Sequence, residues 1–295
     1  MATLRELKGR IGSVASSEKI TGAMKMISSA KMHKAEGILK RLSPFRDCVQ
    51  TIIGGLLSSD AEFSSPLTEA RAQVRTVGVV VLGSDDGLCG GYNVNIFKGM
   101  LEQLSQLREA HGEQVRFVIF PIGKKMNRIV SRMAEKDPMV SVANLGELNS
   151  KSEGDSVKTF AQDIEHRFLS GELDEVLTMY MHFVSAGKQV FKGETYLPAS
   201  PESLATEGKG GKPYLFEPDA ATIFATVLPM YLLSCMQEAF AQNRASEQAA
   251  RVMAMQSAND NAQKLLEQLQ LEYNKLRQQA ITTELLDIVG GQVRD

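Results

Sequence analysis

The stretch SEQAARVMAMQSANDNAQKLLEQLQLEYNKLRQQAITTELLDIVGG, residues 246–291, decides the fold of this chain. A seam of mostly apolar positions recurs in it at alternating steps of three and four residues: Val252, Met255, Asn259, Ala262, Leu266, Leu269, Tyr273, Leu276 and Ala280. This spacing puts them on one face of an α-helix and predicts a coiled coil with a second helix. Asn259 within the seam is typical of a polar residue that sets the register of two paired helices.

The helix that carries this seam is predicted to be very long. Asp219 is its expected start, no proline follows Pro229, and the next glycine is Gly290. Because proline and glycine are the strongest helix breakers, the helix should hold roughly 65 to 70 residues and reach about 100 Å at about 1.5 Å per residue. That length exceeds what a globular core needs, so we expect the chain to be organised around a rod.

Residues 1–58 predict a second long helix, which pairs with the first as an antiparallel coiled coil. One apolar stripe is followed, after a shift of phase, by another: Leu4, Leu7, Ile11 and Val14, then Ile20, Met24, Ile27, Ile38, Leu42, Phe45, Val49, Ile52 and Leu56. The helix also contains Gly9, Gly12, Gly22 and Gly37, each at a cost of about 1 kcal/mol. We expect these glycines to let a neighbouring helix approach closely.

Between the helices, residues 75–198 predict a small, Rossmann-like α/β domain with a partly parallel sheet. The run TVGVVVL (76–82) is rich in β-branched residues, which is typical of a strand buried on both faces of a parallel sheet. Strands and helices alternate after it, with strands at 114–121, 139–142, 175–183 and 189–198 and helices at 94–110, 124–135 and 156–168. Residues 199–218 are predicted to be a mobile linker and foot segment, because Gly, Ser and Lys are frequent up to position 213. The long C-terminal helix then spans 219–291.

The composition excludes several classes of protein. The 295 residues are 43% hydrophobic and 23% charged, with a formal net charge of −2, which suits a soluble protein of one or two packed bodies. Three widely spaced cysteines, Cys48, Cys89 and Cys235, indicate a reducing compartment rather than a disulfide framework. Since the sequence has no apolar leader and no apolar run of membrane-spanning length, we expect membrane association only through a partner. Trp is absent and aromatic residues make up 6%, so nucleic acid is not an expected partner.

Positive charge gathers in the first 46 residues, where ten Lys and Arg residues face only three Glu residues. Such a surplus on a helix is most often a solvated surface. Its functional alternative is attraction to an acidic partner, which is weak for each pair and not directional, so a partner could slide past it.

The motifs of the middle domain do not predict an active site. The segment GLCGG (87–91) follows the first strand but matches neither nucleotide-binding template, and Asp85 and Asp86 place negative charge where a phosphate would bind. We favour a structural turn, with glycine at positive φ and Asn93 at the start of the next helix. Cys89 could be a nucleophile, but no histidine stands in a suitable arrangement, so a packed cysteine is the favoured interpretation. No spacing indicates a catalytic, cofactor-binding or metal site.

Three blocks of the sequence resemble the gamma subunits of F-type ATP synthases: ITGAMKMISSAKMHKA (20–35), SDDGLCGGYNVNIFK (84–98) and, most specifically, the stretch 246–291. YLFEPD (214–219) is a further match. The blocks span essentially the whole chain. The resemblance implies a central rotor shaft whose terminal helices lie inside a hexamer of three alpha and three beta subunits. The α/β domain would be the foot, near the epsilon subunit and the membrane ring of c subunits.

The resemblance also implies how such a shaft functions. Proton flow would turn the c-ring and the shaft. The asymmetric surface of the shaft would then drive each beta catalytic site through states of different nucleotide affinity. Proton translocation would in this way be coupled to ATP synthesis or hydrolysis. The chain itself would be non-catalytic, without a cofactor, and would lie on the cytoplasmic side of the bacterial inner membrane. Two alternatives remain from the residues alone: a static coiled-coil scaffold, and an enzyme with a nucleotide site in the α/β domain.

Individual contact residues follow from matches to the family's motifs. The resemblance assigns contacts with alpha and beta to Met24, Lys25, Glu247, Arg251, Arg277, Gln278, Thr282 and Glu284. It assigns contacts with the c-ring or epsilon to Tyr214 and Glu217. The sequence departs from the family's pattern at Asp86, where Arg is usual, at Val252, where Met is common, and at Gly22, which is often basic. The change at Asp86 predicts a reorganised salt bridge or turn.

Overall fold

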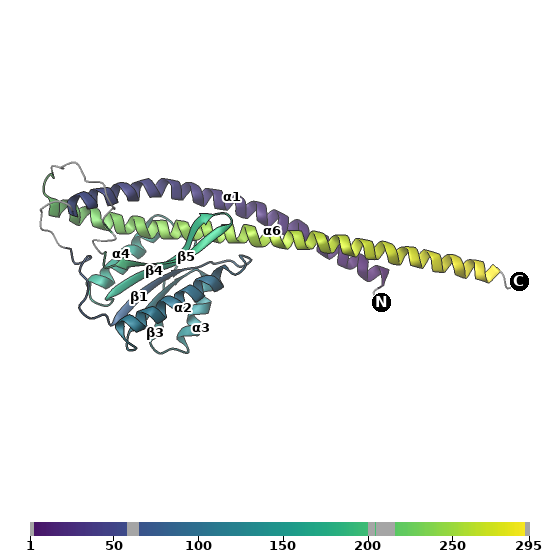
Figure 1. The fold of residues 1–295 in the computed structure, drawn as a ribbon, viewed down its shortest axis with the longest axis horizontal. Coiled ribbons are helices and arrows are strands. Elements are labelled where there is room, and N and C mark those ends of the chain that lie inside the picture. Colours follow the sequence, from purple (N-terminus) through teal and green to yellow (C-terminus); the bar gives the residue numbers. More distant parts are fainter. Residues whose placement is uncertain (1–2, 58–64, 200–203, 205–215, 293–295) are drawn as a thin grey trace.

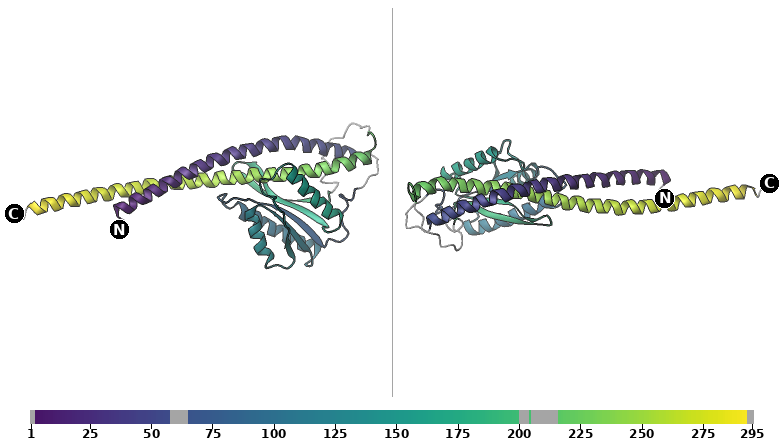
Figure 2. Two further views of the ribbon diagram at one scale, coloured as in Figure 1. Left: turned by 180° about the vertical axis from the view of Figure 1, so that it is seen from behind. Right: turned by 90° about the horizontal axis from the view of Figure 1, so that it is seen from above.

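The structure is a computed structural model that describes residues 3–57, 65–199, 204 and 216–292, and their side chains as far as Leu286. Two long helices, α1 (Leu4–Leu57) and α6 (Ala220–Gln292), lie side by side in opposite directions and form a rod. A small α/β domain packs against one end of this rod (Figure 1). At the other end α6 extends past the beginning of α1, so the rod ends in a single helix (Figures 1 and 2).

The seam predicted on α6 is confirmed. All nine of its positions, from Val252 to Ala280, are buried or half-buried, and every residue between them from Ala262 onward is exposed. Asn259 also makes the predicted contact across the coil, because its Nδ2 donates to the backbone O of Glu18 at 2.8 Å and lies 3.3 Å from Oγ1 of Thr21. A polar bond of this kind favours one register of the two helices over others. At the start of the helix, Oδ1 of Asp219 caps the backbone N of Thr222 at 2.8 Å.

The second stripe predicted on α1 is confirmed at Leu42, Val49 and Leu56 and is wrong at four other positions. The residues that face α6 follow one unbroken series of three- and four-residue steps, all of them buried or half-buried: Leu4, Leu7, Ile11, Val14, Glu18, Thr21, Lys25, Ser28, Met32, Ala35, Leu39, Leu42, Arg46, Val49, Ile53 and Leu56. Four predicted seam residues are instead 41% to 59% exposed: Ile20, Ile27, Phe45 and Ile52. No shift of phase occurs. The apolar pattern misled because polar residues occupy the seam from Glu18 to Ser28.

The expected close approach at glycines of α1 is confirmed at one position only. A Cβ built on Gly22 would lie 3.4 Å from Nδ2 of Asn259, an ordinary van der Waals contact. A Cβ on Gly9, Gly12 or Gly37 would meet no atom within 4 Å. Packing against α6 therefore does not require a glycine at these three positions.

The α/β domain is built on a five-stranded sheet in the order β3-β2-β1-β4-β5. The central strand β1 (Thr76–Leu82) is parallel to both β2 (Arg116–Ile122) and β4 (Glu175–Ser185). At the two edges, β3 (Val140–Val142) is parallel to β2, and β5 (Lys188–Leu197) is antiparallel to β4. The predicted partly parallel sheet is confirmed.

Helices cover both faces of this sheet. Residues Val77, Val79 and Val81 of β1 lie in a core with α2 (Tyr92–His111) and α3 (Lys124–Ala134). Val80 and Leu82 lie in a second core with α4 (Asp155–Leu169) and α6. The layers are therefore α2 and α3, the sheet, then α4 and α6, with α1 packed on α6 (Figure 1). Because α6 belongs to both the domain core and the rod, the two parts share one helix.

By length and composition alone, α6 is apolar enough over part of its length to cross a membrane. Its most apolar part lies at its beginning, where Phe224, Leu228, Leu232 and Phe240 are at most 2% exposed. These side chains belong to the core beneath the sheet. Packing inside the protein therefore accounts for these four apolar side chains.

Candidate functional site

The free end of the rod carries four of the predicted contact residues, all of them exposed: Arg277, Gln278, Thr282 and Glu284. The same stretch exposes large apolar side chains, with Ile281 at 49%, Leu285 at 57% and Leu286 at 65%. A cluster of large apolar side chains in water is typical of a surface that binds a partner. The structure thus gives these four residues an accessible setting, and their contacts with alpha and beta stay a prediction.

Met24 and Lys25 lie on α1, and Met24 lies beside a cavity of about 440 Å³ between α1, the loop after β1, and α6. Met24 is half-buried and lines this cavity, and Lys31 and Lys34 line it as well. Met26 is 74% exposed. The middle of the shaft therefore presents apolar and basic side chains together, as an acidic partner surface would require.

Glu247 and Arg251 contact their own chain. Glu247 is 2% and Arg251 is 6% exposed, and Nη2 of Arg251 donates to Oε1 of Glu247 at 2.7 Å. The same guanidinium bonds the loop after β1, through Nε to the backbone O of Gly87 at 3.2 Å and through Nη2 to that of Asp86 at 3.4 Å. Burial raises the pKa of Glu247, and the adjacent Arg251 opposes that rise. The pair holds the loop on the rod, and its contact with alpha and beta stays a prediction.

The loop after β1 is closed by its own carboxylate. Oδ1 of Asp85 accepts from the backbone N of Lys124 at 3.0 Å, and Oδ2 accepts from the backbone N and Oγ of Ser150 at 3.1 and 2.8 Å. A bound phosphate would compete for such donors, and the amide of Lys124 stands at the start of a helix, where phosphates commonly bind. Because Asp85 already occupies these donors, the geometry does not favour a nucleotide site here.

The turn predicted at GLCGG forms in part as expected. Gly90 has a φ of 59°, but Leu88 also has a positive φ, 64°. Asn93 was expected to start the helix, and this prediction is wrong, because α2 already begins at Tyr92. The side chain of Asn93 instead holds Ser84, accepting from its backbone N at 3.0 Å and donating to its Oγ at 2.7 Å.

Two further residues of this loop have defined surroundings. Asp86, the departure from the family's pattern, pairs with Nζ of Lys151 at 2.9 Å, and this hydrogen bond holds the pKa of Asp86 below its usual value. Both side chains of that pair are more than half exposed. Cys89 is 3% exposed, and burial raises the pKa of its thiol. Because the thiolate is the nucleophilic form, the packed-cysteine interpretation is confirmed.

The predicted contacts at the foot are only partly within the described chain. Glu217 is exposed and lies just before α6 begins at Ala220. Tyr214 and most of the predicted linker at 199–218 lie outside the described residues.

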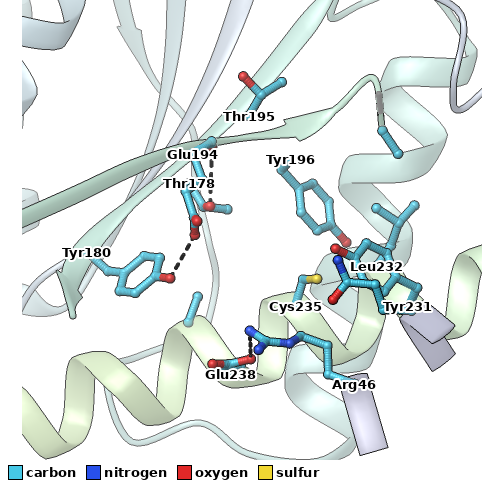
Figure 3. Close-up of a pocket in the computed structure, with 13 residues that line it drawn as sticks. Arg46, Thr178, Tyr180, Glu194, Thr195, Tyr196, Tyr231, Leu232, Cys235 and Glu238 are labelled. Carbon is cyan, nitrogen blue, oxygen red and sulfur yellow. Dashed lines mark hydrogen bonds and ion pairs between the residues drawn. The ribbon is translucent and has the colours of Figure 1, made fainter. Parts of the chain in front are cut away.

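A second cavity, of about 630 Å³, lies between β4, β5, α1 and α6 (Figure 3). Nη1 of Arg46 pairs with Oε2 of Glu238 at 2.6 Å on one side, and the hydroxyl of Tyr180 donates to Glu194 at 2.8 Å on the other. Tyr196 is 5% exposed and also lines this cavity. In the described part of the chain, no group of three His, Cys, Asp or Glu residues is arranged to hold a metal ion.

Glu165 on α4 lies beside Tyr196, and burial raises its pKa to about 7. Between pH 4.5 and 7 the folded chain therefore keeps a proton that the unfolded chain releases, so the free energy of unfolding falls as pH rises across this window.

Replacing Glu165 with Gln removes this loss of stability. We expect the variant to gain stability over the wild type on going from pH 5 to pH 8, measured by urea unfolding. The matched control, Asp163→Asn on the exposed side of the same helix, should show no such gain. An equal gain in both variants would contradict the assignment to Glu165.

Sequence reasoning missed the burial of one set of residues. The segment from Gln242 to Arg251 buries six polar or charged side chains, although nothing in its apolar pattern distinguishes it from the rest of the rod. The available signal was a run of polar residues separated by Ala239, Ala241, Ala245 and Ala249, because small residues admit a close neighbour.

Comparisons with known proteins extend over the full length. A family model described as ATP synthase matches residues 3–293. The chain is 38% identical to the ATP synthase gamma chain of Bacteroides thetaiotaomicron over 305 residues, with 100% of both chains covered. It is 36% identical to the ATP synthase gamma chain of Chromobacterium violaceum over 293 residues, with 99% of each covered.

Solved structures share the fold. A chain of the Euglena gracilis mitochondrial ATP synthase matches with a TM-score of 0.63 at 17% identity, covering 98% of this chain and 93% of that one. A chain of the central stalk and c-ring of the Tetrahymena thermophila enzyme matches with a TM-score of 0.52 at 22% identity, covering 81% and 99%. The full-length family match and the identity to bacterial relatives show that the chain, with its rod and α/β foot, belongs to the ATP synthase gamma chain family.

Proposed function

We propose that this chain is the central rotor shaft of an F-type ATP synthase, coupling proton translocation through the membrane ring to ATP synthesis or hydrolysis in the catalytic hexamer. Membership of the gamma chain family makes it a subunit of such a complex. The coiled-coil rod and the foot domain match chains of solved ATP synthases in fold.

The observation that carries the proposal is the free end of α6. The predicted seam ends at Ala280, yet the helix continues to Gln292 with apolar residues exposed on its surface. A monomeric protein gains nothing from an unpaired helix with exposed Ile and Leu side chains, whereas a shaft enclosed by partners would bury them. Alpha and beta subunits are the proposed partners there, and the exposed residues from Arg277 to Glu284 are the proposed contacts.

The middle and the foot of the chain support the same assembly. Met24, Lys25 and the basic residues beside them are proposed to face acidic surfaces of the beta subunits. Glu217 and Tyr214 are proposed to face the epsilon subunit and the c-ring. The chain is proposed to lie on the cytoplasmic side of a bacterial inner membrane, attached to the membrane only through the c-ring.

The chain is proposed to be non-catalytic. A shaft changes the affinity of a catalytic site for nucleotide only through contact energies that differ between rotational positions. A stiff shaft with an asymmetric surface can supply such contact energies, and it needs no catalytic groups to do so. The loop after β1, whose own Asp85 occupies the donors at the start of α3, is consistent with this role.

The test is reconstitution with the alpha and beta subunits of the same organism. The purified chain alone should hydrolyse no ATP, and the complex should hydrolyse ATP while a bead on the α/β domain turns in one direction. Robust hydrolysis by the chain alone would support the rival enzyme. A hydrolysing complex whose bead stays fixed would support the rival static scaffold.

A further inference from the structure

The contact between the foot and the rod is unusually polar in one short segment. Eleven polar or charged residues of the described chain are buried, and six of them lie between positions 242 and 251 of α6: Gln242, Asn243, Ser246, Glu247, Gln248 and Arg251. Burying polar groups costs free energy unless they are hydrogen-bonded. A concentration of this kind therefore calls for an account beyond the apolar packing that joins the remaining parts of α6 to the domain.

The centre of the segment is Asn243, which is fully buried. Its Nδ2 donates to the backbone O of Gly83, at the end of β1, at 2.9 Å. Its Oδ1 and its backbone O lie 2.6 and 2.9 Å from the hydroxyl of Tyr92, the first residue of α2. One side chain of the rod thereby connects the end of the central strand to the start of the next helix.

Neighbouring residues bond the adjacent strand. Oγ of Ser246 donates to the backbone O of Met181 at 2.8 Å, and Oε1 of Gln242 accepts from the backbone N of Phe183 at 2.9 Å. Arg251 adds its bonds to the backbone O of Gly87 and Asp86. Because β1 and β4 are parallel, their carboxyl ends lie at the same end of the sheet. All these hydrogen bonds are made at that end, by the strands themselves or by the segments that follow them.

These bonds restrain motion in a way that the apolar core cannot. Apolar contact is not directional and depends mainly on the area buried, so it sets the angle of a helix over a sheet less sharply than a hydrogen bond does. Hydrogen bonds require a separation of about 2.7–3.2 Å and a nearly linear angle. Bonds spread over about 15 Å of one helix, each to fixed backbone or to a buried side chain, therefore restrain both translation and rotation.

We propose that Tyr92, Asn243 and Ser246 are positioning residues that fix the angle of the α/β foot on the rod, so that rotation applied to the foot reaches α6 without slip. The proposal rests on the proposed rotor function for its consequence, but the joint itself is a property of the chain. It also gives Glu247 and Arg251 a role inside the molecule, closing the joint on the side of the loop after β1.

The first experiment measures the joint in the full chain without partners. Spin labels are placed on exposed positions of the foot and the rod, at Glu102→Cys and Glu267→Cys, in a background with Cys48→Ser and Cys235→Ser. Pulsed electron resonance then gives the distribution of distances between them. We expect Tyr92→Phe to widen this distribution about twofold, since apolar contact replaces bonds of restricted length. Ser246→Ala, which removes a different bond with little change of volume, is the second variant and should widen it too.

Tyr180→Phe is the matched control. Tyr180 is 5% exposed and Tyr92 is 3% exposed, so each variant removes a buried hydroxyl. The hydroxyl of Tyr180 bonds Glu194 on the neighbouring strand, whereas that of Tyr92 bonds Asn243 on the rod. The control variant should keep the wild-type width. Wild-type widths for both Tyr92→Phe and Ser246→Ala, or equal widening in Tyr180→Phe, would overturn the proposal.

The second experiment measures the consequence in the complex with alpha and beta subunits. In this experiment a bead is attached to the foot, and the spread of its angle is recorded during each pause. Tyr92→Phe should widen this angular distribution by about the same factor as it widens the distribution of label distances. The rate of ATP hydrolysis should be retained. An unchanged angular distribution would contradict the claim that torque passes through this joint. A wild-type bead that never rotates would contradict the proposed function, and the label distances would still decide the joint.

Discussion

Replacing Arg251 with Met should lower the free energy of unfolding of the full chain by about 3–5 kcal/mol. The loss is large because the partner, Glu247, is 2% exposed and would be left buried without its cation. The loop after β1 would also lose the bonds from Arg251 to Gly87 and Asp86. Urea unfolding followed by circular dichroism measures the change.

Two further variants identify the cause. Arg251→Met combined with Glu247→Leu should recover most of the loss, because an apolar pair of similar volume replaces a buried ion pair at little net cost. Lys151→Met removes the partner of Asp86 from an ion pair that is 62% and 65% exposed, and should cost less than about 1 kcal/mol. If the double variant were no more stable than Arg251→Met, the unpaired carboxylate would not be the reason for the loss.

The Arg251→Met variant should also depend on pH in a defined direction. Burial already raises the pKa of Glu247, and removing the cation raises it further. The folded variant then binds a proton that the unfolded chain releases, so its stability falls as pH rises above the usual glutamate pKa. The deficit relative to the wild type should therefore be smaller at pH 5 than at pH 8.

Replacing Met24 with Lys should impair coupling in the assembled complex far more than it changes stability. Met24 is half-buried beside the cavity that Lys31 and Lys34 also line. A new cation opposite an acidic beta surface would add a local ion pair that must break in every turn. An added interaction of about 1.4 kcal/mol corresponds to roughly a tenfold change in rate, so we expect roughly that loss in ATP-driven proton pumping.

The control for this variant is Met24→Leu, which keeps volume and apolar character and should pump at the wild-type rate. The ratio of protons pumped to ATP hydrolysed, measured in vesicles, separates coupling from activity, and urea unfolding confirms that the fold is intact. A pumping rate and a ratio that are both unchanged in Met24→Lys would count against the proposed contact between Met24 and the beta subunit.

The two helices show how far periodicity predicts a coiled coil. On α6 the seam consists almost entirely of apolar residues, so the apolar pattern and the buried face coincide from Val252 to Ala280. On α1 the buried face passes through Glu18, Thr21 and Ser28. An apolar pattern cannot locate a seam made of polar residues, because their partners, such as Asn259, come from the other helix.

The contact residues divide in the same way. Those at the free end of α6 could be placed on an exposed helix from the sequence, since no other described part of the chain lies beside the helix there. The setting of Glu247 and Arg251 could not be predicted, because their burial depends on a loop more than 160 residues earlier in the chain. Asp86 likewise finds its partner in Lys151, 65 residues away.

The sequence by itself determined the long rod, the partly parallel sheet and the resemblance that names the family. Helical periodicity, β-branched runs and sequence motifs are formed by residues that are close together in the chain, so they can be recognised without the structure. Only the tertiary structure decided the seam of α1, the closure of the loop after β1 and the polar joint around Asn243. Each of these depends on hydrogen bonds between distant segments, such as Asn243 and Gly83, which lie 160 positions apart. Such bonds produce no recognisable pattern of residue spacing in the sequence, because only the fold brings the donor and the acceptor together.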